Sequence, residues 1–349
     1  MDGGFGGTVE GVTMGENTGV VTKAKKSGGG GKKGKSEEAS AGDTIPAKLS
    51  LKHTFGCNPI PTDSILAYNS LTGDRDINDR LVFRVGKQVC IYDPDTLKQS
   101  YLTGRSRSVT NVIHYAVSSS CRYLSVCESV RRLKIGSGHA QASIYSLTSS
   151  TSFSRLKTIT HNCSGEFICS AFTGDSKYLV TLNDGNEYQI IIWQWEKEKM
   201  YKSVSIQTRP TKLCVSPSHL QITISGPAIF KCYSLSSDGQ FRTSSLVNPS
   251  KEAETYLDHK WLPLTDSVHR IVAISNSESV MDGYRRQSVY IFEGTEAPPG
   301  TVGPPINIEF RQTVYPRFES PGGSVDGIAA FSKGEWVVCC SLPCVGVIR

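Results

Sequence analysis

One segment of the sequence matches the pattern of a phosphate-binding loop. Residues 29–36 read Gly-Gly-Gly-Lys-Lys-Gly-Lys-Ser, which satisfies GxxxxGKS letter by letter. In a true phosphate loop a buried strand precedes the glycines and a helix follows, and together they aim backbone N–H groups and the lysine at the phosphates. The flanking residues are mostly Lys, Gly, Ser, Glu and Ala and can form neither element. We interpret the match as part of a flexible basic tail. Of the three hypotheses that we consider for the function of the chain, nucleotide binding by these residues is the weakest.

Histidines and cysteines are the other residue types that could carry chemistry. There are 11 cysteines and no CxxC pair. His161 is followed by Cys163 and Cys169, but no further ligand falls at the spacing of a metal site. Cys90, Cys169 and Cys232 lie inside apolar strand patterns, where reduced cysteines act as small core residues. No Gly-x-Ser-x-Gly elbow, HExxH motif or convergent carboxylate pair appears. We therefore predict a protein that is not an enzyme, with no catalytic residue, metal site, cofactor or small-molecule substrate.

Basic residues cluster in three places that the pattern predicts to be connections between strands. Loops on a rigid scaffold are where binding residues concentrate, and arginine forms bidentate contacts with carboxylates. These clusters are candidate partner-contact loops for an acidic protein surface, with a solvated loop as the alternative. Their members are Arg105 and Arg107, then Arg131, Arg132 and Lys134, and finally Arg285 and Arg286.

The positive charge is concentrated near the N-terminus. The formal net charge is +6, and six lysines lie in the acid-free window 23–35. Without them, the remaining 32 basic residues equal the 32 acidic ones. Since the body is neutral, we expect no nucleic-acid partner. No apolar run approaches the roughly 18 residues that cross a bilayer and no secretory signal opens the chain, so we expect no membrane contact and an intracellular location.

The elements that would position these residues form a repeat of short strands. The clearest copy covers residues 167–195, where three strands rich in apolar, β-branched and aromatic residues alternate with polar turns. The pattern recurs about every 50 residues, near the length of a four-stranded propeller blade. No helical period is visible, so the chain is predicted to be all-β. The equivalent positions are Ile91, Ile144, Ile191, Phe230 and Ile291.

Two regions follow from this pattern. Residues 1–47 lack the apolar content to offset their ordering entropy, so we expect a disordered Gly/Lys-rich tail. Residues 48–349 are predicted to form a WD40-like β-propeller with about six blades visible. Because the sequence stops inside an apparent last strand, we expect the propeller to be incomplete and the native protein to continue past Arg349.

Three stretches resemble one family of WD-repeat proteins. They are residues 118–129, the run Trp-Gln-Trp-Glu-Lys at 193–197 in place of the usual Trp-Asp, and His-Lys-Trp at 259–261. The combination is similar to the cilia- and flagella-associated protein 57 family, over roughly residues 50–349. The chain departs from the family in having no coiled-coil region, and the usual Gly-His and Trp-Asp signatures are missing.

The resemblance implies a non-catalytic scaffold of the motile cilium or flagellum, located on the axoneme. Its implied partners are inner dynein arm components and tubulin of the doublet microtubules, where family members help to attach and position the dynein arms. The alternative is a general cytosolic WD40 adaptor, for example in ubiquitin ligation or translation.

Overall fold

A computed structural model describes fifteen segments of the chain, which divides into two units, Met1–Ser50 and Leu51–Arg349. All described residues belong to the second unit; they are 66–68, 80–94, 96–102, 109–130, 140–148, 153–162, 165–235, 239–246, 254–262, 268–281, 284–298, 304–315, 325–330, 336–340 and 346–348. The predicted tail, with the lysine window and residues 29–36, lies outside them, so its disorder stays a prediction.

The described residues form six antiparallel sheets, each built from strands that follow one another in the chain. The first sheet contains β1 (Leu66–Tyr68), β2 (Arg80–Val85), β3 (Gln88–Asp93) and β4 (Lys98–Leu102). The second contains β5 (Val109–Val117), β6 (Tyr123–Val130), β7 (Ala140–Ser146) and β8 (Arg155–His161). The third contains β9 (Phe167–Phe172), β10 (Leu179–Asp184), β11 (Tyr188–Gln194) and β12 (Lys199–Ile206), with a short 3₁₀ turn, η1 (Trp195–Lys197), between the last two.

The remaining sheets repeat this order. The fourth contains β13 (Lys212–Val215), β14 (Gln221–Gly226), β15 (Ile229–Leu235) and β16 (Phe241–Ser245). The fifth contains β17 (Glu254–Trp261), β18 (His269–Met281), β19 (Tyr284–Glu296) and β20 (Ile306–Val314). The sixth has three strands, β21 (Val325–Ala330), β22 (Trp336–Cys340) and β23 (Gly346–Ile348). The prediction of an all-β, WD40-like fold with about six blades is confirmed.

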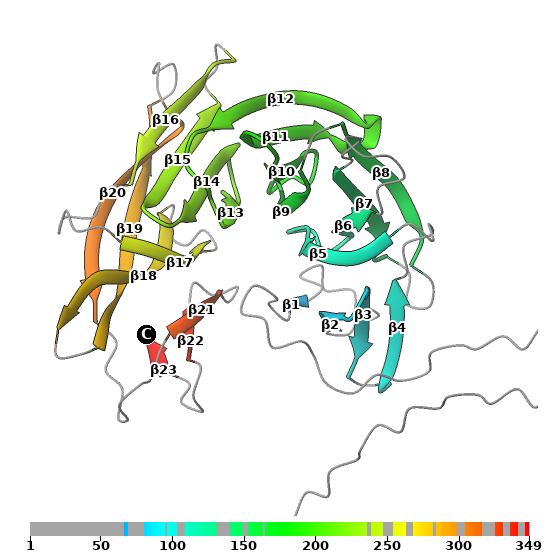
Figure 1. Cartoon of the computed structure of the whole chain (residues 1–349), viewed down its shortest axis with the longest axis horizontal. Helices are drawn as coiled ribbons and strands as arrows, with labels where there is room; N and C mark the ends of the chain where they lie inside the picture. Colours follow the sequence, from blue (N-terminus) through cyan, green and yellow to red (C-terminus); the bar gives the residue numbers. More distant parts are fainter. Residues whose placement is uncertain are drawn as a thin grey trace, which may run out of the picture. The chain divides into compact units, whose positions relative to one another are not determined.

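The sheets stand side by side in an arc, in chain order, with the first strand of each nearest the centre (Figure 1). Contacts between first strands link the sheets: β5 contacts β9, β9 contacts β13, β13 contacts β17 and β17 contacts β21. Within the described segments the arc does not close into a ring. The first strands of sheets two to five therefore share one central space.

The core lies between neighbouring sheets. Strands β10, β14 and the middle of β11 are buried on both faces, as expected for sheets covered on each side. Cys90, Cys169 and Cys232 are buried, as predicted for small core residues. No described helix is long and apolar enough to cross a membrane.

The outermost strands were not predicted. Strand β12 reads Lys-Met-Tyr-Lys-Ser-Val-Ser-Ile and is mostly exposed, and β16 is exposed over its last four residues. Exposed strands of this kind lack the short buried apolar runs by which the other strands were recognised, so the sequence showed three strands where five of the six described sheets have four. Trp195, predicted to end a strand, instead lies in η1 and is buried.

A close approach of two backbones fixes how the third and fourth sheets pack. A Cβ atom built on Gly174, in the turn between β9 and β10, would lie 1.6 Å from the carbonyl oxygen of Pro217, in the turn between β13 and β14. Only glycine fits there without moving the backbone.

We therefore expect Gly174→Ala to lower the free energy of unfolding by about 1–3 kcal/mol, the usual cost of overpacking. Urea denaturation measures it. Lys177→Ala is the matched control in the same turn, because the Lys177 side chain is 76% exposed and should change stability by less than about 0.5 kcal/mol. Equal effects of the two substitutions would show that the close approach carries no stability.

Candidate functional site

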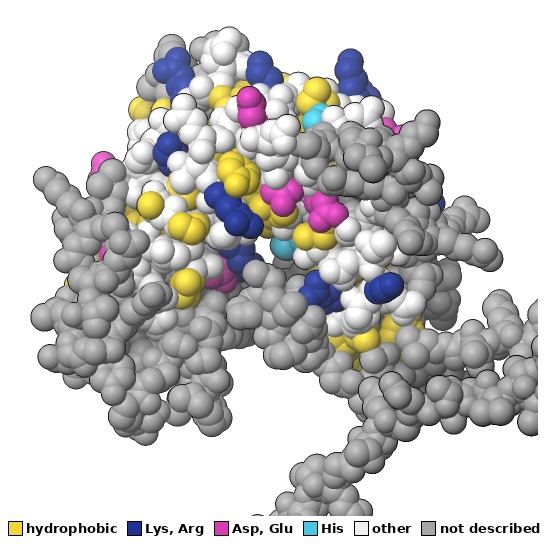
Figure 2. All heavy atoms as spheres, in the orientation of Figure 1, with side chains coloured by type: hydrophobic (Ala, Val, Ile, Leu, Met, Phe, Trp, Pro, Cys, Tyr) yellow, Lys and Arg dark blue, Asp and Glu magenta, His cyan; other side chains and the backbone are white. Residues whose placement is uncertain are grey.

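The first strands of four sheets surround a pocket at the centre of the arc. The pocket has a volume of about 220 Å³ and is lined from β5, β9, β13 and β17. On the face in Figure 2, basic, acidic and histidine side chains gather around a central hollow. Small-molecule sites usually measure about 300–1,000 Å³, so this pocket is small for one. Its polar lining includes His114, Ser119, Ser170, Lys212, Cys214 and Lys260.

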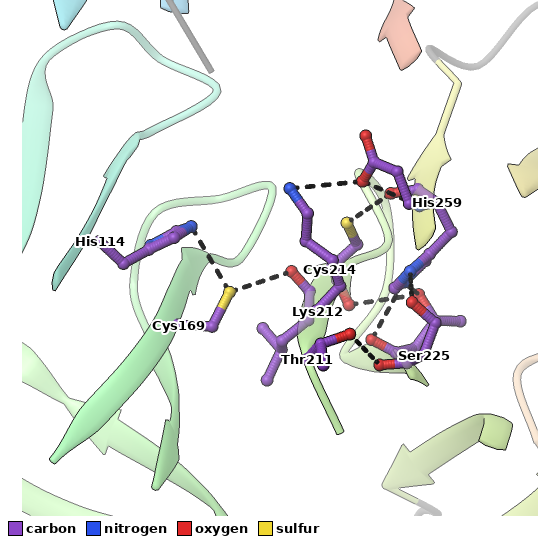
Figure 3. A network of polar contacts seen from close by, with 10 residues as sticks. His114, Cys169, Thr211, Lys212, Cys214, Ser225 and His259 are labelled. Atoms are coloured by element: carbon purple, nitrogen blue, oxygen red, sulfur yellow. Dashed lines mark hydrogen bonds and ion pairs between the residues drawn. The ribbon is translucent and has the colours of Figure 1, made fainter. Parts of the chain in front are cut away.

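A series of hydrogen bonds along one side of the pocket connects three sheets. The Ser170 backbone N–H donates to His114 Nδ1 at 3.2 Å, so the ring proton is on Nε2. His114 Nε2 lies 3.5 Å from Cys169 Sγ, and the Cys169 thiol donates to the Leu213 carbonyl at 3.7 Å. These hydrogen bonds join β5 to β9 and β9 to β13 (Figure 3). His114 therefore uses both ring nitrogens to hold neighbouring strands together.

A second network joins β17 to the fourth sheet. The imidazole of His259 is buried, with Nδ1 2.7 Å from Ser225 Oγ and Nε2 2.9 Å from Thr223 Oγ1. The indole of Trp261 donates to the same Thr223 hydroxyl at 2.9 Å. The Cys214 thiol donates to the His259 carbonyl at 3.1 Å, closing the network from the pocket side. Every polar group of the His259 ring is therefore in use within the structure.

A buried ion pair lies between these networks. Lys212 Nζ is 3.4 Å from Asp258 Oδ1, and the two side chains are 13% and 5% exposed. Asp258 Oδ1 also accepts the His259 backbone N–H at 2.9 Å. Burial is the largest single influence on Lys212 and would lower its pKa, but the charge and hydrogen bond of Asp258, together with the Cys169 and Cys214 thiols, outweigh it and the pKa is raised. Lys212 therefore stays charged, and its charge is neutralised by Asp258.

Two histidines and two thiols that line the pocket or lie next to it are held in unreactive forms. Burial, with the charges of Lys212 and Lys260, lowers the pKa of His114 to about 3. Burial also lowers the pKa of His259 to about 4, against the opposing charge of Asp258. Burial raises the pKa of the Cys214 thiol to about 12 and raises that of Cys169. At neutral pH both histidines are neutral and both thiols are protonated.

These forms suit neither a catalytic thiol nor a general base. A catalytic cysteine needs a depressed thiol pKa, and a general base needs a pKa near the working pH. The pocket provides neither. Lys212 is paired with Asp258, whereas Lys260 forms an ion pair with no carboxylate in the part of the chain that the structure describes. What the pocket can do is present one cationic side chain on a rigid polar frame.

The sequence also has a relative among characterised proteins. No protein-family model matches the chain. The chain is similar to mouse cilia- and flagella-associated protein 57. The two are 25% identical over 218 residues, which is 60% of this chain and 16% of the mouse protein. This similarity supports a distant relationship between the two proteins. The chain spans about a sixth of the length of its relative.

The two buried histidines predict a loss of stability in acid. The folded-state pKa values of His114 and His259 lie below the ordinary value of 6.5, so the unfolded chain binds more protons below that pH. Their contribution is present above about pH 6.5 and is lost as the pH falls toward about 4. Each histidine adds a slope of up to about 1.4 kcal/mol per pH unit in that window.

His114→Gln should remove one of these two slopes. The variant keeps an acceptor for the Ser170 N–H but cannot be protonated, so its stability should fall less steeply with pH. Urea denaturation of both proteins at about pH 7, 6 and 5 measures the difference. If the free energies of unfolding of the two proteins fall in parallel with pH, His114 titrates normally in the folded protein despite its burial.

The structure places few of the sequence-predicted contact residues. Arg105 and Arg107 lie outside the described residues, as do Arg131, Arg132 and Lys134. Arg285 and Arg286 were predicted to lie in a connection between strands, and this is wrong: both lie in β19, with Arg285 paired to Val280 of β18. The hairpin extends beyond the apolar segment that marked the strand. The role of all seven residues in partner contact stays a prediction.

Sequence reasoning missed the groups that the fold brings together. His114, Lys212 and His259 lie on strands of three different sheets, and nothing in the local sequence indicates that these strands converge. One signal was available: polar residues occur inside otherwise apolar inner strands, where a buried polar group must find a partner. His259, in the run Asp-His-Lys-Trp, contributes to the family resemblance, but that resemblance gives no sign of its buried hydrogen bonds.

Proposed function

We propose that the chain is a non-catalytic, partner-binding scaffold with a cilium-related role. The observation that carries the proposal is the similarity to mouse cilia- and flagella-associated protein 57 over 60% of this chain. The fold adds support, because propeller blades form a rigid frame for binding proteins. The central pocket adds further support, since its histidines, thiols and buried ion pair are arranged for structure and not for reaction.

In its finer form the proposal places the protein on the axoneme of the motile cilium or flagellum. There it helps to assemble or position inner dynein arms on doublet microtubules, with dynein-arm components and tubulin as partners. Lys260 lies at the pocket and is a suitable contact for a partner's carboxylate, because it forms no ion pair among the described residues and a cation attracts acidic surfaces.

Localisation of the tagged full-length protein in a flagellated cell tests the proposal. We expect signal along the axoneme that survives detergent extraction. Affinity purification should recover dynein-arm and tubulin peptides. Signal confined to the cytosol or nucleus, with ubiquitin-ligase or translation factors recovered instead, would support the general adaptor and refute the ciliary role.

A charge reversal tests the pocket separately. Lys260→Glu should reduce recovery of these partners, whereas Lys199→Glu, at an exposed position on the outer strand β12, should not. Equal recovery with both variants would show that partners bind elsewhere on the propeller.

A further inference from the structure

A cluster of two histidines and one glutamate lies away from the central pocket, where the fourth and fifth sheets meet. His219 is in the turn between β13 and β14, His269 is the first residue of β18, and Glu296 is the last residue of β19. His219 Nε2 lies 3.4 Å from Glu296 Oε1, and His269 Nε2 lies 3.3 Å from the same oxygen. The imidazole rings are 5.8 Å apart. One carboxylate oxygen therefore faces two ring nitrogens.

The fold holds these groups in place. His269 of β18 pairs with Gly294 of β19, and Glu296, two residues further along β19, emerges on the same face of the sheet. A Cβ atom on Gly294 would lie 3.3 Å from the His269 Cβ and 2.5 Å from Ile306 Cγ2, so glycine leaves the room that the imidazole occupies. His269 is fixed by the sheet, and the β13–β14 turn brings His219 to it from the neighbouring sheet.

We propose that His219, His269 and Glu296 bind a divalent transition-metal ion, for which zinc is the best fit. The three donor atoms lie within 4.8 Å of one another. Zinc binds imidazole nitrogen and carboxylate oxygen at about 2.0–2.2 Å, and a tetrahedron of that size has edges of about 3.3–3.6 Å. The distances from Glu296 Oε1 to the two nitrogens match such edges.

The donor set selects the class of metal. Two imidazoles favour zinc and similar transition metals over magnesium or calcium, which prefer oxygen ligands. Ser218 Oγ lies 3.4 Å from His269 Nδ1, where it can accept a hydrogen bond from Nδ1–H and leave Nε2 free for the metal. The Glu296 side chain is 58% exposed, so the site opens to solvent. The fourth position is available to water or to a donor from another protein.

Hydrogen bonds alone are the competing explanation for the cluster. Both imidazoles can donate a hydrogen bond to Glu296. These bonds lower the pKa of the Glu296 carboxyl group, and the bond from His269 has the larger effect. Charge-assisted hydrogen bonds are usually about 2.7–2.9 Å long, however, and both contacts exceed that by about half an ångström. The spacing therefore suits a shared ion better than two direct bonds.

Metal titration of the intact chain tests the site. After dialysis against a chelator, calorimetry with ZnCl₂ should show one ion per chain, and the midpoint of thermal unfolding should rise with zinc concentration because the three ligands come together only in the folded protein. Titration with CoCl₂ identifies the ligands, since nitrogen and oxygen donors give visible bands without the near-ultraviolet charge-transfer band of thiolates. The 11 cysteines are thereby distinguished from the proposed site.

Variants decide which residues bind. His219→Gln and Glu296→Gln should each weaken zinc binding by more than about 100-fold, and Ser218→Ala, which removes only an outer hydrogen-bond partner, by about tenfold. Glu309→Gln is the matched control, since it removes the same charge at an exposed position on β20 of the same sheet. Glu296→Gln is at an exposed strand end and should fold normally, which an unchanged unfolding midpoint in chelator would verify.

The proposal is overturned if the wild-type chain binds no zinc at one ion per chain. It is also overturned if Glu296→Gln binds as tightly as Glu309→Gln, or if the cobalt spectrum shows thiolate ligation. Each of these results would leave the cluster as a hydrogen-bonded contact between two sheets.

Discussion

Replacing Asp258 with alanine is expected to lower the free energy of unfolding by about 3–5 kcal/mol, the cost of leaving one charge of a buried pair without its partner. Lys212 would then be a buried ammonium next to neutral histidines and thiols, with the Lys260 charge nearby. The substitution also removes the acceptor of the His259 backbone N–H. Urea denaturation at neutral pH measures the change.

Two further variants show whether this loss of stability depends on the burial of the ion pair. Glu198→Gln breaks the pair that Lys157 Nζ and Glu198 Oε1 form at 3.1 Å, whose side chains are 38% and 49% exposed. Its cost should be no more than about 1 kcal/mol. The double variant Lys212→Met/Asp258→Leu removes both buried charges and should recover most of the stability. A double variant as unstable as Asp258→Ala would show that packing, and not charge, controls this position.

The pH dependence of the pair has a fixed sign. The pKa of Lys212 is raised in the folded protein, so its contribution is complete below the ordinary lysine value of 10.5. It is lost only as the pH rises through the higher folded value. Within the neutral range the contribution of Lys212 to the stability of the wild-type protein should therefore be constant, and the acid sensitivity of the protein should come from other groups, including the buried histidines.

The second large effect is expected at Trp195. Its ring is 3% exposed and lies 4.9 Å from the ring of Tyr123, on β6 of the neighbouring sheet. It also packs edge-on against Phe172 at 6.3 Å, and its Nε1–H donates to the Ser176 carbonyl at 2.8 Å. Trp195→Ala should cost about 3–5 kcal/mol, as for other buried aromatic residues.

A series at the same position separates packing from the hydrogen bond. Trp195→Phe keeps most of the ring but leaves the Ser176 carbonyl without its donor, so it should cost about 1–3 kcal/mol. Leu156→Ala is the control, since Leu156 is 41% exposed on the outer strand β8 and should change stability by less than about 0.5 kcal/mol. If Trp195→Ala behaves like Leu156→Ala, the second and third sheets are not joined through this ring.

The inner strands could be predicted from the sequence because burial leaves a clear mark on them. Strand β9 begins at Phe167, where the clearest copy of the pattern begins, since a short run of apolar residues is bounded there by turn residues. The outer strands β8, β12 and β16 carry mostly polar side chains on an exposed edge and leave no such mark. Their position is set by backbone pairing with β7, β11 and β15. The types of the side chains do not indicate this pairing.

The candidate sites could not be predicted because they depend on the order of sheets in space. His114 meets Cys169, and Lys212 meets Asp258, only because the first strands of successive sheets are neighbours. The same holds for His219 and Glu296, which are 3.4 Å apart across two sheets. The three arginine clusters were visible in the sequence because their members are adjacent, which is a local property and says nothing about convergence.

The order of the strands has a consequence for how the protein is made. Each sheet consists of strands that are consecutive in the chain, so its hairpins close without a long crossover and cost little entropy. A sheet can pair its strands as soon as the last of them has left the ribosome, before the sequence of the next sheet has been translated. Its first strand then offers the surface on which the first strand of the next sheet packs. Synthesis would thus build the arc in one direction, each finished sheet serving as the template for its successor.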